Sequence, residues 1–150
     1  MNLIVFTDGG SRGNPGNAAI GVIAYMTDKQ FSFENKANLE IAYEYSGFIG
    51  QATNNEAEYQ AIINAIKWIS TEQLKYEKIV FYLDSKLVVE QINKNWKIKD
   101  ERMKKYAHEF WKIAEENKII LEIIHVRREF NSEADALVNQ ALDNQELLKN

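Results

Sequence analysis

Two aspartates directly follow short apolar runs whose composition is typical of buried strands. Asp8 follows residues 3–7, and Asp84 follows residues 78–83. If the two strands are parallel neighbours, both carboxylates lie at the carboxyl edge of one sheet, where α/β proteins bind their ligands. Taken singly, either aspartate is better explained as the start of a turn or the cap of a following helix.

Glu58 lies on the apolar stripe of a predicted helix that begins near Asn54. It precedes Ile62 by four residues and Ala65 by seven, so its carboxylate is expected to point inward, toward the sheet. A buried glutamate is costly unless it is paired or metal-bound. The alternative is that Glu58 turns out to solvent at the helix end or pairs with an arginine.

Asp135 lies in the first turn of the last predicted helix, where stabilisation of the helix dipole by about 0.3–1 kcal/mol explains it without a further role. If Asp8, Glu58, Asp84 and Asp135 converge, however, bound cations must neutralise their repulsion. Oxygen-only ligand sets favour Mg²⁺ or Mn²⁺. Two such ions about 3.5–4 Å apart are typical of in-line displacement at phosphorus.

The composition limits the other kinds of site that the chain can form. The chain has 150 residues, 45% of them hydrophobic, and is predicted to form one domain, residues 1–150. Cysteine is absent, which excludes disulfides, thiolate chemistry and zinc-finger sites. With only His108 and His125 present, a histidine-rich metal site is also excluded.

The net charge of −4 argues against a protein that binds nucleic acid by bulk attraction alone. It is compatible with a nucleic-acid-binding protein whose acidic residues are neutralised by cations. No apolar run approaches the roughly 20 residues of a membrane span. The N-terminal residues also lack the features of a signal peptide. We therefore expect a soluble, cytoplasmic monomer without membrane contact.

The elements that must position the carboxylates follow from hydrophobic periodicity and capping signals. The predicted strands are residues 3–7, 18–26, 40–48, 78–83 and 119–126. The predicted helices are residues 54–70, 85–93, 100–117 and 132–148. Thr53 and Glu56 fit a capping box, and the polar residues 27–38 are expected to form a long hairpin tip.

The connections between these elements predict the topology. The first three strands are joined by turns and are expected to be antiparallel neighbours, whereas the last two follow helices and are expected to run parallel to the first. The predicted fold class is α/β, with a mixed five-stranded sheet (three antiparallel and then two parallel strands) and helices on both faces.

Two segments have the composition of phosphate-binding surfaces. The first contains Gly9, Gly10, Ser11 and Asn14. It matches neither a P-loop nor a dinucleotide fingerprint, but its glycines allow backbone groups to approach a sugar-phosphate chain. A plain hairpin loop is the alternative.

The second segment is Thr53, Asn54 and Asn55 at a helix N-terminus, where phosphate binding and helix capping are both natural roles. Farther along the chain, basic residues surround Trp96, a pattern typical of contact with a nucleic-acid backbone. These residues are Lys86, Lys94, Lys97, Lys99, Arg102, Lys104 and Lys105. A solvated helix face and a packed tryptophan are the alternatives.

Four motifs, taken in chain order, resemble those of type 1 ribonuclease H. They are Thr7-Asp8-Gly9-Gly10-Ser11 with Gly13-Asn14-Pro15-Gly16, Thr53-Asn54-Asn55-Glu56-Ala57-Glu58-Tyr59, Asp84-Ser85-Lys86-Leu87-Val88-Val89, and Arg128-Glu129-Phe130-Asn131-Ser132-Glu133-Ala134-Asp135-Ala136-Leu137. Each motif supplies one of the four carboxylates, and the resemblance that they carry extends, in order, over essentially the whole chain.

The resemblance implies a ribonuclease H-like fold and magnesium-dependent endonucleolytic hydrolysis of the RNA strand in RNA–DNA hybrids, which leaves 5′-phosphate and 3′-hydroxyl ends. It implies that two Mg²⁺ ions, replaceable by Mn²⁺, are held by the catalytic residues Asp8, Glu58, Asp84 and Asp135. It also implies contacts to RNA 2′-hydroxyls and to a DNA-strand phosphate. The expected substrate-binding residues are Gly9, Gly10, Ser11, Asn14, Asn54 and Asn55 on the RNA side, Thr53 on the DNA side, and Trp96.

Three departures from the family pattern affect these expectations. The long basic protrusion of many bacterial members is missing, since residues 94–102 form only a short turn, so substrate binding is expected to be weaker and more salt-sensitive. Lys86 stands where the family often has glutamine. The loop before Asp135 is short, as in archaeal and plant-type relatives, and the flexible histidine that helps product release in bacterial members has no clear counterpart.

The two histidines of the chain are therefore not assigned to catalysis. His125 lies in a predicted strand and is expected to be packed there, which leaves Arg128 as an alternative to assist the reaction. His108, in the middle of a predicted helix, is expected to be structural or solvent-exposed.

Three other functions remain alternatives on the sequence alone. A non-hydrolytic nucleic-acid-binding module would bind without metal-dependent turnover, and it leaves four acidic residues facing a polyanion unexplained. An ATP-binding lobe of the actin and sugar-kinase class needs a second lobe, for which 150 residues leave no room. An integrase-like or junction-resolving nuclease shares the sheet and the carboxylates, but Asn14, Asn54 and Asn55 favour the hybrid-specific enzyme.

Overall fold

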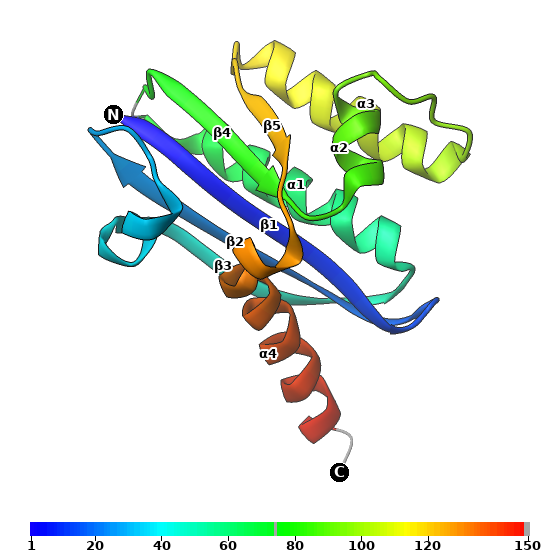
Figure 1. Ribbon diagram of the computed structural model, residues 1–150. Helices are drawn as coiled ribbons and strands as arrows, with labels where there is room; N and C mark the ends of the chain where they lie inside the picture. Colours follow the sequence, from blue (N-terminus) through cyan, green and yellow to red (C-terminus); the bar gives the residue numbers. More distant parts are fainter. Residues whose placement is uncertain (74, 149–150) are drawn as a thin grey trace.

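The computed structural model describes residues 1–73 and 75–148, which form a five-stranded mixed sheet with helices on both faces (Figure 1). The strands are β1 (Asn2–Gly13), β2 (Gly16–Thr27), β3 (Glu40–Ala52), β4 (Lys78–Leu83) and β5 (Glu122–His125). Their order across the sheet is β3-β2-β1-β4-β5. The first three strands pair antiparallel, β4 is parallel to β1, and β5 is parallel to β4, so the predicted topology is confirmed.

The described residues form four α-helices and two short 3₁₀ helices. The α-helices are α1 (Asn54–Thr71), α2 (Lys86–Ile92), α3 (Glu101–Glu116) and α4 (Ser132–Leu148), and the 3₁₀ helices are η1 (Phe33–Asn38) and η2 (Arg128–Phe130). Thr53 and Glu56 form the predicted capping box at the start of α1. Ser85 and Asp100 cap α2 and α3. Among the described residues, none of the helices has the length and apolar character needed to cross a membrane.

Side chains of β1 alternate between two hydrophobic clusters, as the period of an extended strand requires. Leu3 and Val5 pack in the cluster that α1, α2 and α3 complete, whereas Ile4 and Phe6 pack in a second cluster with residues from the start of α4. Figure 1 shows α4 on one side of the sheet and α1 on the other. The central strand is therefore covered on both faces, which fixes its position.

Four strands differ in length from their predictions, and β2 (Gly16–Thr27) is longer at both ends than the predicted 18–26. β1 does not end at Thr7 but continues to Gly13, because β2 pairs with it without interruption from Asn2↔Thr27 to Gly13↔Gly16. Asp8 consequently lies within a strand rather than at its end, and the predicted glycine-rich loop is reduced to a tight turn. β3 likewise extends to Ala52, whereas β5 is shorter than predicted.

The segment predicted as a hairpin tip, residues 27–38, is instead folded against the sheet. It contains η1, and the rings of Phe31 and Phe33 pack against the cluster around Phe6. The ring centroid of Phe33 is 6.1 Å from that of Phe6. The two phenylalanines of an otherwise polar segment thus bring it onto the same face of the sheet as α4, over the part that α4 does not cover.

The contact between α4 and the sheet depends on Gly21 of β2. A Cβ atom at this position would lie 2.3 Å from the carbonyl oxygen of Ala134 and 2.9 Å from Cβ of Leu137. The backbone of α4 therefore approaches β2 more closely than any residue with a side chain allows. This close approach sets the position of the N-terminal turns of α4, which carry Asp135.

Gly21→Ala should destabilise the protein by about 1–3 kcal/mol, because the added methyl group forces α4 away from the strand. The free energy of unfolding, measured by urea titration, tests this. Gly10→Ala is the matched control, since its Cβ would meet its nearest neighbour, Cγ1 of Val138, at an ordinary 3.6 Å. Equal unfolding midpoints for the two variants would show that α4 does not depend on Gly21.

Candidate active site

The parallel register of β1 and β4 brings Asp8 and Asp84 together. Phe6 is aligned with Tyr82 and Thr7 with Leu83, so the next residues on the two strands are the two aspartates. By strand alternation, both side chains follow the face of Ile4 and Phe6, which is the α4 side of the sheet. The predicted proximity of the two carboxylates is confirmed, although Asp8 lies within its strand and Asp84 directly after β4.

Glu58 reaches the same place from the opposite face because Gly9 has no side chain. A Cβ atom on Gly9 would lie 2.2 Å from the carbonyl carbon of Ala57 and 2.5 Å from the amide nitrogen of Glu58. The Gly9 amide donates to Oδ1 of Asp8 at 3.0 Å and to Oε1 of Glu58 at 3.3 Å. Glu58 is only 6% exposed, so the prediction that it points inward is confirmed.

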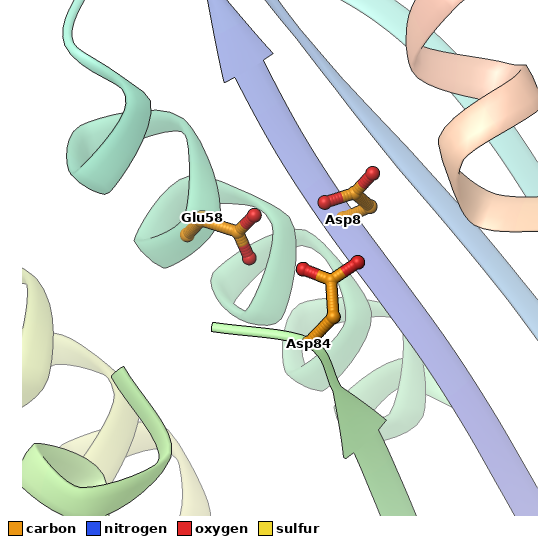
Figure 2. A group of neighbouring side chains, drawn as sticks. All are labelled: Asp8, Glu58 and Asp84. Atoms are coloured by element: carbon orange, nitrogen blue, oxygen red, sulfur yellow. The ribbon is translucent and has the colours of Figure 1, made fainter. Parts of the chain in front are cut away.

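The three carboxylates form one group. Asp8, Glu58 and Asp84 each offer an oxygen, and these oxygens all lie within 4.8 Å of one another. Figure 2 shows the three side chains pointing toward one another from β1, from α1 and from the end of β4. Oε2 of Glu58 is buried without a hydrogen-bond partner among the described residues. A set of oxygen ligands with an unsatisfied buried acceptor fits a hard divalent cation.

The pKa values of the group are raised. Burial raises the pKa of Asp8 from 3.8 to about 7, and the charges of Asp84 and Asp135 add to this, while a hydrogen bond with Glu58 opposes it. The pKa of Glu58 is raised well above its ordinary value, first by burial and then by the charge of Asp8. The pKa of Asp84 is raised by burial, against the lowering effects of Asn131 and Arg128. Full ionisation therefore requires a compensating positive charge.

Asp135 lies beside this group but is not part of it. It is half-buried in the first turn of α4, and its charge contributes to the raised pKa values of Asp8 and Asp84. Its amide donates to the carbonyl oxygen of Asn131 at 3.1 Å. Nδ2 of Asn139 donates to its carboxylate oxygen Oδ2 at 3.4 Å. The fourth predicted carboxylate is thus near the site, outside the set of mutually close oxygens.

Asn131 is a site residue that the sequence reasoning missed. It is fully buried, and its Nδ2 donates to the carbonyl oxygen of Thr7 at 2.9 Å and to Oδ2 of Asp84 at 3.3 Å. It therefore connects β1, the end of β4 and the start of α4. In the sequence it looks like an ordinary residue before a helix, and its only signal was its place in the last of the four motifs.

The two predicted substrate segments form one surface. Oδ1 of Asn54 accepts from the amide of Ser11 at 2.9 Å and from its hydroxyl at 3.2 Å. Oδ1 of Asn14 accepts from the amide of Asn54 at 3.0 Å. The β1–β2 hairpin and the N-terminus of α1 are therefore held together, with the side chains of Asn54 and Asn55 exposed. The hydroxyl of Thr53 serves as the cap of α1.

Trp96 lies between α2 and α3, and its side chain is 45% exposed, so it does not pack in the core. Nζ of Lys86 lies 5.9 Å from the centroid of its ring. Arg102, from the same basic set, pairs with Glu56 at 3.1 Å. The arrangement presents an aromatic ring with a neighbouring cation to solvent.

The prediction for His125 is wrong. This residue is exposed rather than packed, and one ring nitrogen lies 3.3 Å from the carbonyl oxygen of Asp84. β5 is an edge strand that ends at His125, so this side chain lies beyond the core contacts that bury Ile123. His108 is exposed on α3, as predicted.

Without divalent cations, stability should fall as pH rises, because folding raises the pKa of Asp8 to about 7. Such a group stabilises the fold fully below its unfolded-state pKa and loses this contribution as pH rises through the folded-state value. Asp8→Asn removes the contribution of Asp8 to this dependence and lessens the repulsion on Glu58. In EDTA at about pH 8, the variant should be more stable than the wild type by on the order of 1–3 kcal/mol.

Urea unfolding of both proteins in EDTA, at about pH 5 and about pH 8, measures the difference. The wild type should lose more stability than Asp8→Asn between the two conditions. Parallel pH profiles, or a less stable variant at the higher pH, would contradict the assigned repulsion.

Comparisons with known proteins agree with this geometry. A family profile described as "Reverse transcriptase-like" matches residues 6–141. The chain is 35% identical, over 95% of its length, to the "Bifunctional protein Rv2228c" of Mycobacterium tuberculosis, of which the match covers 36%. It is 34% identical to the "Ribonuclease HI" of Halobacterium salinarum, with 92% of this chain and 63% of the relative covered. The chain thus spans only about a third of the length of the first of these relatives.

Among solved structures, a similar one is the crystal structure of LC11-RNase H1 in complex with an RNA/DNA hybrid. It has a TM-score of 0.83 and 34% sequence identity, and the match covers 95% of this chain and 98% of the other. The fold, the order of the motifs and the carboxylate group agree with these similarities. The chain belongs to the reverse transcriptase-like family, among its type 1 ribonuclease H members.

Proposed function

We propose that this protein is an endoribonuclease that hydrolyses the RNA strand of RNA–DNA hybrids and leaves 5′-phosphate and 3′-hydroxyl ends. The observation that carries the proposal is the group of three carboxylates, contributed by β1, α1 and the end of β4, whose oxygens lie within 4.8 Å of one another. The similar protein LC11-RNase H1, solved with an RNA/DNA hybrid, supports the choice of substrate. In this proposal, residues 1–150 are one catalytic domain that acts as a monomer in the cytoplasm.

The proposed cofactor is Mg²⁺, two ions per site, with Mn²⁺ as a substitute. Asp8, Glu58, Asp84 and Asp135 would hold the ions, since all four offer carboxylate oxygens and the first three have raised pKa values that a cation would lower. When bound, such ions supply an activated water and neutralise charge on the leaving oxygen.

The protein's own contribution is to orient these carboxylates. The backbone amide of Gly9 donates to one oxygen each of Asp8 and Glu58. The side-chain amide of Asn131 donates to one oxygen of Asp84. Because β1 pairs with β2 as far as Gly13 and with β4 as far as Thr7, and α1 packs directly on Gly9, the backbone segments that carry Asp8 and Glu58 cannot move apart without breaking backbone contacts. This preorganisation is what an in-line displacement at phosphorus requires.

The surface formed by the β1–β2 hairpin and the start of α1 is the proposed contact for the RNA strand. Its members are Gly9, Gly10, Ser11, Asn14, Thr53, Asn54 and Asn55. Because Ser11 holds Oδ1 of Asn54, the plane of this amide is fixed, and Nδ2 is directed away from Ser11. A fixed amide donor suits recognition of a 2′-hydroxyl, the group that distinguishes RNA from DNA. Trp96 and the basic residues around it are the proposed contact for the rest of the duplex.

Asp84→Asn should lower the rate of hybrid cleavage by at least about 100-fold, because it removes one charge from the group that holds the cations. Asp28→Asn is the matched control, since Asp28 is exposed and follows Thr27, whose partner Asn2 is the first residue of β1, far along the strand from Asp8. Circular dichroism should show both variants folded.

The assay uses an RNA–DNA hybrid, double-stranded RNA and double-stranded DNA, with each strand labelled in turn, with and without Mg²⁺. Cleavage confined to the RNA strand of the hybrid and dependent on the metal is expected. Binding of the hybrid without metal-dependent cleavage would instead indicate a non-hydrolytic binding module.

Asn54→Ala should raise the KM for the hybrid by about tenfold with a smaller change in kcat, since it removes the amide donor and frees the hairpin at Ser11. Asn64→Ala is the control, because Asn64 also lies on α1 but well beyond its N-terminal turn. There its Oδ1 accepts a hydrogen bond from the hydroxyl of Tyr43 on β3. Steady-state kinetics measures both variants. An unchanged KM for Asn54→Ala would remove this surface from the proposal.

A further inference from the structure

Lys36 is a buried charged residue in η1, where the sequence predicted only a polar hairpin tip. Only 9% of the residue is exposed. Its Nζ donates to Oε1 of Glu133 at 2.8 Å and to the carbonyl oxygen of Phe130 at 3.2 Å, and lies 4.4 Å from the centroid of the Phe6 ring. Burial of an ammonium group is unfavourable unless all of its contacts are well placed, so its surroundings are specific.

The partners of Lys36 lie on both sides of Asn131 and shortly before Asp135. Phe130 ends η2, and Glu133 lies in the first turn of α4. Between them is Asn131, which donates to Asp84, and two residues beyond Glu133 is Asp135. A single ammonium group therefore holds the segment 130–133 at two points.

Aromatic contacts strengthen the same connection. The ring centroid of Phe33 lies 5.1 Å from that of Phe130 and 6.1 Å from that of Phe6. The connection between β2 and β3, residues 28–39, is much longer than the two-residue loop that suffices to join antiparallel strands. Its extra length places Phe33 and Lys36 against the start of α4.

We propose that Lys36 is a positioning residue for the cleavage reaction: it fixes residues 130–135 so that Asn131 orients Asp84 and Asp135 stays beside the carboxylate group. The proposal rests on the proposed function. Lys36 itself contacts none of the three clustered carboxylates, Asp8, Glu58 and Asp84, and no residue of the surface proposed for the RNA strand. It acts through Phe130 and Glu133. A misplacement of site groups by about 1 Å is enough to slow catalysis substantially.

A purely structural ion pair predicts different behaviour. Its loss would lower the melting temperature and leave kcat unchanged once the protein is folded. Loss of a positioning residue should lower kcat, leave the KM for the hybrid unchanged, and loosen residues 130–135 locally.

Lys36→Met keeps the aliphatic part of the side chain against Phe6 and removes the charge. We expect kcat to fall by about tenfold with KM unchanged. Lys36→Arg, which retains the charge, should recover most of the rate. Lys67→Met is the control, because it breaks an ion pair that is similarly short but more exposed, at 3.1 Å to Glu109, between α1 and α3; it should keep the kcat of the wild type. All rates are measured below the melting temperatures of all variants.

Hydrogen exchange gives a readout that does not depend on activity. In Lys36→Met, the backbone amides of Asn131 and Asp135 should exchange faster than in the wild type. They donate to the carbonyl oxygens of Arg128 and Asn131, respectively. The amides of α1 should be unaffected. Glu133→Gln, which is expected to fold because Glu133 is partly exposed, should show the same pattern more weakly, and the double variant should be no slower than Lys36→Met alone.

Wild-type kcat and unchanged exchange in folded Lys36→Met would overturn the inference. So would a loss of kcat that is additive in the double variant. If Lys36→Met does not fold, Glu133→Gln decides by the same two readouts. If the wild type does not cleave the hybrid, the proposed function fails, whereas the exchange of the Asn131 and Asp135 amides still shows whether Lys36 fixes this segment.

Discussion

Repulsion between carboxylates whose oxygens lie within 4.8 Å of one another is the interaction that the rest of the structure has to oppose. Asp8 and Glu58 are more than nine-tenths buried, so water screens their charges poorly. A loop would relax away from such a contact. Here the residues are fixed instead by a central strand that is paired on both sides and by an 18-residue helix whose inner face is part of the main core. The strand cannot shift without losing ladder hydrogen bonds, nor the helix without exposing apolar surface, so the repulsion is retained.

Two close backbone contacts make this arrangement possible. At Gly9 the helix α1 lies directly on β1, and at Gly21 the helix α4 lies directly on β2. The first contact allows Glu58 to reach across the sheet to Asp8, and the second sets the start of α4, where Asp135 lies. Stability and function oppose each other here, because carboxyl groups with raised pKa values make ionisation above those values a cost to folding, which a bound cation would relieve.

The sequence alone was sufficient where one local signal dominates. β4 and α4 have the predicted bounds because an apolar run and an amphipathic stripe end clearly. Glu58 was found by helical spacing alone. The extension of β1 through its glycines could not be predicted, because their local preference is for turns and only the pairing with β2 decides otherwise. Asn131 and Lys36 were missed for the same reason: their roles exist only through partners about 50 to 120 residues away in the chain.

The distribution of positive charge separates affinity from selectivity under the proposed function. In the β1–β2 hairpin, Arg12 is paired with Asp143 at 2.7 Å and with Glu146 at 2.6 Å, both on α4, so its charge is largely neutralised. The hairpin therefore offers a polyanion mainly amides, hydroxyls and the side chains of Asn14 and Asn54. Such groups discriminate a 2′-hydroxyl from a hydrogen atom but attract phosphate weakly. Electrostatic attraction falls instead to the lysines around the exposed Trp96, between α2 and α3. Because this charge is modest in a chain of net charge −4, the cations that the proposed function places on the carboxylates would contribute to the attraction for the substrate as well as to the chemistry.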